Sequence, residues 1–231
     1  MAGSLHICNA TRASPHNVCE RASLLMTKPP EEGEIWEWRA FGQPSEATLD
    51  IIRNHPIRMG VKDHRGEDLY LISPISDQNV KLRQWKREWV LKFKLLLTTA
   101  KRGIELYTET AGWVHRFPIG PELLSHAARL LGTSLPESAE STTKFSAENL
   151  IDILAHATPP IFEVRVRKLR SQFDFGDGWV ELSEARFPNQ TIQSLSIHSP
   201  KTAVVESILD LCETGPEMEV MNYVEACRRW G

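Results

Sequence analysis

The stretch Leu91-Lys92-Phe93-Lys94-Leu95 alternates strictly between apolar and basic residues. Successive side chains of a β-strand point to opposite faces, so a period of two places both lysines on one face and the apolar residues on the other. Val80-Lys81-Leu82-Arg83, a few residues upstream, has the same pattern. The two stretches predict neighbouring strands whose basic side chains collect on one side of a sheet.

Three further segments alternate in the same way, before and after these two. They are Ile35-Trp36-Glu37-Trp38-Arg39, Glu163-Val164-Arg165-Val166-Arg167 and Val180-Glu181-Leu182-Ser183. Like charges on adjacent strands repel, so a sheet that gathers this many cations indicates a strongly anionic ligand among them. The alternative is the solvated face of an ordinary antiparallel sheet whose other face packs on a core.

Length and composition set wider limits. The chain has 231 residues, of which 41% are hydrophobic and 25% charged, enough to build one large β-rich domain or two small ones. A net charge of −3 argues against a general nucleic-acid binder, which usually carries a basic excess. No run reaches the roughly 18 apolar residues needed to cross a bilayer, and no signal peptide is recognisable, so we expect no membrane partner and a cytoplasmic location. The four cysteines lack short paired spacing and predict reduced thiols.

Turn residues and helix caps divide the chain into predicted elements. Residues 1–30 are expected to form an irregular leader and residues 31–231 a single domain. Strands are expected up to about residue 41 and at about 57–62, 67–73, 78–84, 88–98, 103–109, 112–117, 161–175, 178–187 and 191–198. Helices are expected at about 45–54, 121–131, from Ser146, at 201–212 and at 222–230. Several turns are too short for helical crossovers, so the pattern predicts an α+β fold with a closed or nearly closed antiparallel sheet and helices outside it.

These segments, in this order, resemble the CYTH or triphosphate tunnel metalloenzymes over roughly Glu34 to Trp230. The resemblance implies an antiparallel barrel of about eight strands around a tunnel. In the family, basic residues of the tunnel bind a triphosphate and acidic residues bind a divalent metal. No single segment is specific to the family, but their order is.

Each matching segment corresponds to one element of the family. Ile35 to Arg39 resembles the end of its Glu-x-Glu-x-Lys strand, and Lys81-Leu82-Arg83 resembles its Arg-x-Arg strand. Glu163 to Lys168 resembles the basic strand that opens the second half, and Trp179 to Glu184 the acidic strand that follows. The remaining matches are Leu195-Ser196-Ile197-His198, in place of the last Glu-x-Glu strand, and Asn222 to Cys227, which is similar to the C-terminal helix of polyphosphate-related members.

The resemblance also implies roles for individual residues. Phosphate contacts are expected from Arg39, Lys81, Arg83, Lys92, Lys94, Arg165 and Arg167. Glu37 and Glu181 are expected to be the catalytic carboxylates and to hold Mg²⁺ or Mn²⁺. The implied reaction is attack of water on a terminal phosphorus, with the metal and the basic side chains neutralising the phosphate oxygens.

Two departures from the family pattern weaken the metal half of this site. Ile35 replaces the first acid of the N-terminal motif, and Ser196 and His198 replace the last pair. Further candidate ligands are Glu105, Glu163 and Glu184. Because hard cations need several oxygen ligands, the metal affinity is expected to be low. The alternative for each acid is a salt bridge inside the barrel that neutralises nearby lysines and arginines without a metal.

The sequence leaves three classes of function open. The enzyme reading is a weak metal-dependent triphosphatase, a phosphoanhydride hydrolase. The binding reading is a catalytically inactive sensor of polyphosphate or a nucleotide. The third reading is a protein-interaction module on a degenerate tunnel fold. Dependence on metal separates the three, because an enzyme needs it for turnover whereas a sensor can bind the anion alone.

Overall fold

The computed structural model describes residues 33–54, 61–85, 87–108, 114–139, 143–212 and 214–231. Within these ranges ten strands form one antiparallel sheet. The strands are β1 (Glu34–Phe41), β2 (Val61–Ile72), β3 (Asn79–Trp85), β4 (Glu88–Thr99), β5 (Glu105–Thr108), β6 (Val114–Arg116), β7 (Phe162–Asp174), β8 (Trp179–Arg186), β9 (Thr191–Ser199) and β10 (Glu219–Val220). The α-helices are α2 (Glu46–Asn54), α3 (Pro121–Leu131), α4 (Ala147–Ala155), α5 (Thr202–Leu211) and α6 (Tyr223–Trp230), with 3₁₀ turns η1 (Lys101–Gly103) and η3 (Glu137–Ala139).

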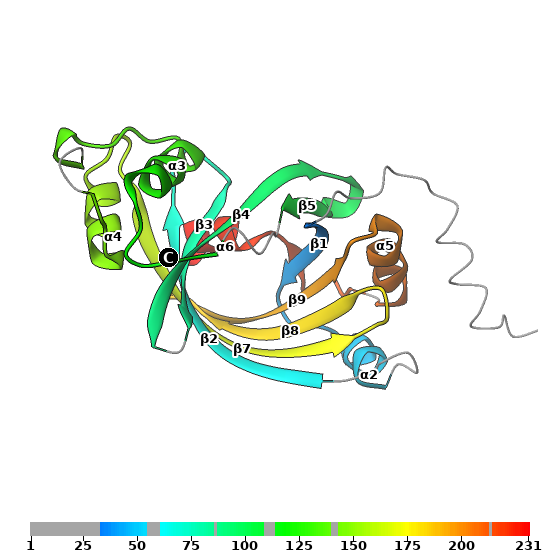
Figure 1. Ribbon diagram of the computed structural model, residues 1–231. Helices are drawn as coiled ribbons and strands as arrows, with labels where there is room; N and C mark the ends of the chain where they lie inside the picture. The colour runs from blue at the N-terminus through cyan, green and yellow to red at the C-terminus, as the bar shows by residue number, and fades with distance from the viewer. Residues whose placement is uncertain (1–32, 55–60, 86, 109–113, 140–142, 213) are drawn as a thin grey trace, which may run out of the picture.

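Eight of the strands close into a barrel (Figure 1). They follow the order β1-β5-β4-β3-β2-β7-β8-β9, and β9 pairs back onto β1 with Arg39 opposite Ser196. The other two strands add to the barrel from outside the ring, β6 on β4 and β10 on β1. The predicted α+β fold with a closed antiparallel barrel and helices outside it is confirmed.

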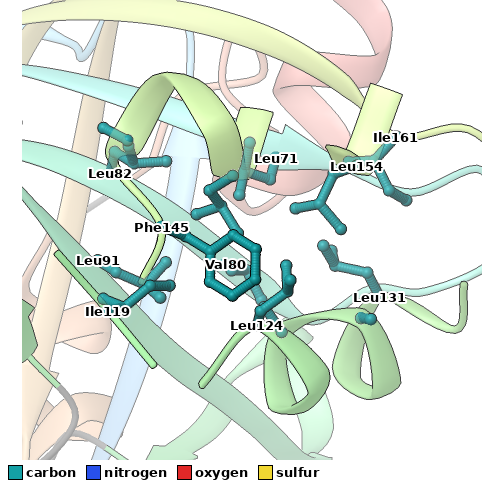
Figure 2. Packing of buried hydrophobic residues seen from close by; sticks show 14 of the residues in the cluster. Leu71, Val80, Leu82, Leu91, Ile119, Leu124, Leu131, Phe145, Leu154 and Ile161 are labelled. Carbon is teal, nitrogen blue, oxygen red and sulfur yellow. The ribbon is translucent and has the colours of Figure 1, made fainter. Parts of the chain in front are cut away.

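Helices cover two sides of the barrel. The outward face of β2, β3 and β4 is apolar, and α3 and α4 pack on it (Figures 1 and 2). Both helices have clear ends: Gly132 adopts φ +67° after α3, and Ser146 caps α4 through the backbone nitrogen of Asn149. A second cluster joins α5 and Ile52 of α2 to the outward face of β1, β8 and β9. The outward stripes of these strands are therefore core, which leaves their charged stripes facing the lumen.

The helix α6 fills one end of the lumen. Its side chains Tyr223, Val224 and Cys227 pack against inward-facing residues of several strands, among them Phe41 and Val166. Phe41 lies two residues beyond Arg39 on the same face of β1, so this strand changes from ionic to apolar along its inward face. The lumen thus contains an apolar plug at one end and an ionic cavity next to this plug.

Arg228 fastens this helix to the loop between β2 and β3. Its guanidinium donates to the carbonyl oxygens of Ser73 and Ser76 at 2.9 and 2.6 Å and to Asp77 at 2.6 Å. We expect Arg228→Met to lower the free energy of unfolding by about 1–3 kcal/mol, because two carbonyls lose a charged donor. Its neighbour Arg229 makes an exposed ion pair with Glu219, so Arg229→Met should cost less than about 1 kcal/mol. Urea denaturation measures both, and equal losses would contradict this role of Arg228.

Two expectations about the elements need comment. Only residues 61–62 of the strand expected at 57–62 are described, and they lie in the same strand, β2, as most of the strand expected at 67–73. This strand continues through Gly66, because Gly66 keeps its place in the ladder opposite Lys168. Residues 55–60, and the leader expected at 1–30, lie outside the described residues. In the part of the chain that the structure describes, each helix is too short or too polar to cross a bilayer.

Candidate functional site

A cavity of about 120 Å³ lies in the ionic part of the lumen. Six basic side chains from four strands line it: Arg39, Lys81, Arg83, Lys94, Lys168 and Arg170. The rest of the wall consists of the acids Glu37 and Glu181 and the polar or aromatic residues Asn79, Tyr107, Trp179, His198, Asn222 and Tyr223. Basic donors therefore surround the cavity on several sides.

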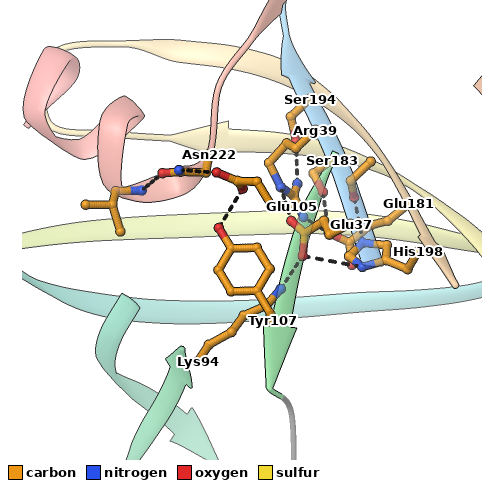
Figure 3. A network of polar contacts seen from close by, with 12 residues as sticks. Glu37, Arg39, Lys94, Glu105, Tyr107, Glu181, Ser183, Ser194, His198 and Asn222 are labelled. Carbon is orange, nitrogen blue, oxygen red and sulfur yellow. Dashed lines mark hydrogen bonds and ion pairs between the residues drawn. The ribbon is translucent and has the colours of Figure 1, made fainter. Parts of the chain in front are cut away.

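Glu37 of β1 is the centre of the first ion-pair cluster (Figure 3). Arg39 donates from Nε to its Oε1 at 2.9 Å, and the ammonium of Lys94 from β4 donates to its Oε2. Burial alone would raise the pKa of Glu37, but Lys94 and Arg39 hold it well below the usual range. Glu37 is therefore an ionised, buried carboxylate whose two oxygens are both paired.

Asp68 of β2 is the centre of a second cluster. Its Oδ1 accepts from Arg83 at 2.9 Å, and its Oδ2 lies 2.9 Å from the ammonium of Lys168 and 3.3 Å from that of Lys81. Lys168 also donates to the hydroxyl of Tyr70 at 2.6 Å. Burial lowers the pKa of Lys168 to about 8 and that of Lys81 well below its ordinary value, although Asp68 opposes both shifts. One carboxylate thus balances three cations only in part.

Glu181 of β8 forms the third cluster. Arg39 and Arg170 lie 3.7 and 3.8 Å from its two oxygens, and Ser183 donates a hydrogen bond to Oε1 at 3.1 Å. The buried Nε of Arg170 has no hydrogen-bond partner within the described ranges, which leaves a charged donor free in the wall of the cavity. Arg39 therefore lies between Glu37 and Glu181 and contacts both.

His198 and Trp179 form one wall of the cavity. Their rings stack in parallel with centroids 4.9 Å apart, and Ser196 bonds to Nε2 of the imidazole at 2.9 Å. Burial lowers the pKa of His198 although Nδ1 lies 3.4 Å from Glu37. The imidazole is therefore mostly neutral at pH 7 and adds little to the charge of the cavity.

The floor of the cavity is where α6 begins. The ring of Tyr223 lies under the ammonium of Lys168, 3.4 Å from the ring centroid, and under the guanidinium of Arg39 at 4.6 Å. Glu105 accepts hydrogen bonds from Tyr107 at 2.6 Å and from Asn222 at 2.9 Å. Burial raises the pKa of Glu105. These contacts tie α6 to β5 and fix the aromatic floor beneath the cations.

The structure brings together most of the residues expected at the site. Arg39, Lys81, Arg83 and Lys94 line the cavity with Glu37 and Glu181. Lys92 lies directly opposite Lys81 in the β3–β4 ladder and so shares the inward face. Ser196 and His198 are buried in the same wall, and Ile35 occupies the inward stripe of β1.

The expectation that Arg165 and Arg167 point into the cavity is wrong. Both side chains lie on the outer face of β7, 52% and 70% exposed, and both pair with Glu67 at 2.9 Å. The physical reason is the plug: the inward positions at this end of β7 are taken by Val164 and Val166, which pack on α6. The possible ligands Glu163 and Glu184 also lie outside this cavity, Glu163 exposed and Glu184 paired with Arg186.

The site includes three residues that were not expected from the sequence: Asp68, Lys168 and Arg170. Lys168 and Arg170 lie on the same inward face of β7 as Val164 and Val166. Arg165 and Arg167, which were expected at the site, are each shifted by one residue and so lie on the opposite face. Asp68 lies opposite Arg83 in the β2–β3 hairpin. That register was the signal that could have identified it, because an acid opposite an arginine indicates an ion pair across the ladder.

In their present positions, the carboxylates of the cavity do not form a site for a divalent metal ion. Both oxygens of Glu37 and of Glu181 already face side-chain cations. Ile35 offers no oxygen where the family pattern has an acid. Throughout the described ranges, no three His, Cys, Asp or Glu side chains are grouped so that they could hold a metal ion.

Comparison with known proteins finds similarity in structure only. No family model and no curated protein matches the chain. A conserved hypothetical protein from Pyrococcus furiosus matches at 16% identity and TM-score 0.45, over 83% of this chain and 98% of its own. A proposed adenylyl cyclase from Hippeastrum with a dominant triphosphatase activity matches at 15% and 0.47, over 85% and 95%. The capping-enzyme triphosphatase of Mimivirus matches at 12% and 0.44, over 85% and 95%. All three matches are at low sequence identity, and their TM-scores lie below 0.5.

Proposed function

We propose that the cavity binds a triphosphate or a longer polyphosphate, either inorganic or as part of a larger molecule. The observation that carries this proposal is the excess of cations at the cavity: six lysines and arginines, four of them buried, meet three carboxylates, those of Glu37, Asp68 and Glu181. Buried like charges repel strongly, and the lowered pKa values of Lys81 and Lys168 are a result of burial that an anion would reverse. A ligand with several negative charges supplies what the wall lacks.

The distribution of the donors favours a chain of phosphates over a single anion. Arg39, Lys81, Lys94 and Lys168 belong to four different strands, so their charged groups surround the lumen. Phosphate oxygens accept several charge-assisted hydrogen bonds each, and guanidinium groups bind them in a fixed geometry. The unpartnered Nε of Arg170 is one donor available for such a contact in the described part of the chain.

Hydrolysis of this anion with Mg²⁺ or Mn²⁺ stays a prediction from the sequence resemblance. The same holds for a cytoplasmic location. Glu37 and Glu181 would have to hold the metal, and their ion pairs oppose this. Binding is therefore the function that the geometry supports best, ahead of turnover.

A thermal-shift titration with tripolyphosphate at low salt tests the binding proposal. We expect the melting temperature to rise with ligand concentration, because a ligand that binds only the native state stabilises it by mass action. Lys81→Met should weaken binding by about tenfold to a hundredfold, the usual effect of losing one charge-assisted hydrogen bond.

Arg165→Met is the matched control, because it removes the same unit of charge from the outer face of the barrel. It should leave the titration unchanged. Added salt should weaken binding to the wild-type protein, because the contacts are ionic. A flat melting temperature at millimolar tripolyphosphate would refute the proposal.

A further inference from the structure

Both carboxylate oxygens of Glu37, of Asp68 and of Glu181 already face a cation of the chain itself. Arg39 pairs with Oε1 of Glu37, while Lys94 and the imidazole of His198 face its Oε2. The oxygens of Asp68 face one arginine and two lysines. Those of Glu181 face Arg39 on one side and Arg170 on the other.

A divalent cation would have to displace these partners. Mg²⁺ and Mn²⁺ bind through several oxygens, each of which must turn toward the metal. Here each such turn would leave a buried lysine or arginine without its counter-ion, which is strongly unfavourable. The metal would also lie among the positive charges of the remaining lining, which repel it.

Arg39 is the residue at the centre of this arrangement. It is 6% exposed, and its guanidinium contacts Glu37 and Glu181 at once, at 2.9 and 3.7 Å. The ring of Tyr223 supports it from below, 4.6 Å from the guanidinium carbon. A fixed cation thus occupies the space between the two carboxylates that the sequence pattern assigns to a metal.

We propose that Arg39 takes the place of a divalent metal between Glu37 and Glu181, so that the cavity binds an oligophosphate as the free anion. This proposal rests on the proposed binding function and specifies the form of the ligand. Free tripolyphosphate is bound directly by the lysines and arginines of the wall. The metal complex of the same anion is a poorer ligand, because it carries less negative charge and brings a cation into a basic cavity.

Calorimetric titration with tripolyphosphate, first in a chelator and then in excess Mg²⁺, tests the form of the ligand. We expect binding in the chelator and an apparent affinity at least severalfold lower with Mg²⁺, since the metal also removes the free anion. Binding that appears only when Mg²⁺ is present would overturn the inference and leave the proposed function standing. Absence of binding under both conditions would refute the proposed function and, with it, the anion-binding half of this inference.

Direct titration with Mn²⁺, followed by the spin-resonance signal of the free ion, tests the role of Arg39 without phosphate. The wild-type protein should show no Mn²⁺ binding at the cavity up to millimolar concentration. Arg39→Met should bind Mn²⁺ at least about tenfold more tightly, because one repelling charge is lost and one oxygen each of Glu37 and Glu181 loses its cation. Mn²⁺ binding by the wild-type protein that is lost in Glu37→Gln would overturn the proposal.

Two further variants separate the position of the charge from its amount. Arg39→Lys keeps a cation at the same place and should bind no Mn²⁺. Arg83 pairs with Asp68 and not with Glu37 or Glu181. Arg83→Met therefore removes one charge from the same cavity, but it should gain much less Mn²⁺ affinity than Arg39→Met. Equal gains in Arg83→Met and Arg39→Met would show a general charge effect and would also overturn the role assigned to Arg39.

Discussion

Replacing Asp68 with asparagine should lower the free energy of unfolding by about 3–5 kcal/mol at pH 6, the usual cost of removing one partner from a buried ion pair. Asp68 is 2% exposed and is paired with Lys81, Arg83 and Lys168. Asparagine has nearly the same shape, so packing is retained while the counter-charge is lost. The loss should shrink at pH 9, because Lys168, with a pKa of about 8, then sheds its proton.

Urea denaturation at the two pH values measures this effect. Asp210→Asn is the control, since Asp210 is 71% exposed and pairs with Arg102 at 2.6 Å on the surface. It should cost less than about 1 kcal/mol at either pH. If Asp68→Asn matched this control, Asp68 would not be the counter-ion of the buried lysines. Tripolyphosphate should restore stability to Asp68→Asn by a larger amount than to the wild-type protein, because the variant has more uncompensated positive charge.

The affinity for tripolyphosphate should fall as the pH rises above 8. Burial lowers the pKa of Lys168 to about 8 in the free protein, and a bound anion raises it again. Below pH 8 the lysine already carries its proton, so binding needs none. Above pH 8 the protein must take up a proton to bind, which lowers the affinity by up to about tenfold per pH unit until the pKa of the complex is reached.

The anion itself also titrates with pH, so the comparison must be with a variant. Lys168→Arg keeps the charge at this position but cannot lose its proton in this range. The ratio of wild-type to variant affinity, measured by calorimetry from pH 6.5 to 9.5, cancels the ionisation of the ligand. A ratio that stays constant across this range would exclude Lys168 as the titrating group. Lys81, whose pKa burial also lowers, contributes a proton of its own to the wild type and to the variant alike.

The strand pattern made the barrel predictable, because apolar and charged residues alternate along the strands that face the lumen. Which stripe of β7 faces inward was not predictable. Along this strand the inward positions change from Val164 and Val166 to Lys168 and Arg170, since an apolar helix fills one end of the lumen and ions the other. The polarity of the side chains alone therefore does not show which face of β7 points to the lumen. The inward face was assigned to positions shifted by one residue from the correct ones.

The same ambiguity hid the acid of the second cluster. Glu67 and Asp68 are neighbours in sequence but lie on opposite faces of β2. Glu67 pairs with Arg165 and Arg167 outside the barrel, whereas Asp68 pairs with Lys168 inside it. Only the pairing of β2 with β3 and β7 decides which acid serves which set of cations, and this pairing depends on the whole barrel.

The closure of the barrel has a consequence for how the protein matures on the ribosome. Arg39 reaches its hydrogen-bond partner Ser194 across 155 positions of sequence, and the aromatic floor under it belongs to α6, which follows later still. Contacts of such long range form late in folding. Until β9 has emerged, a nascent chain leaves the edge of β1 that β9 covers unpaired, and until α6 follows, the positively charged lumen lacks its aromatic floor. The ion pairs within the lumen neutralise part of its positive charge until the barrel is closed.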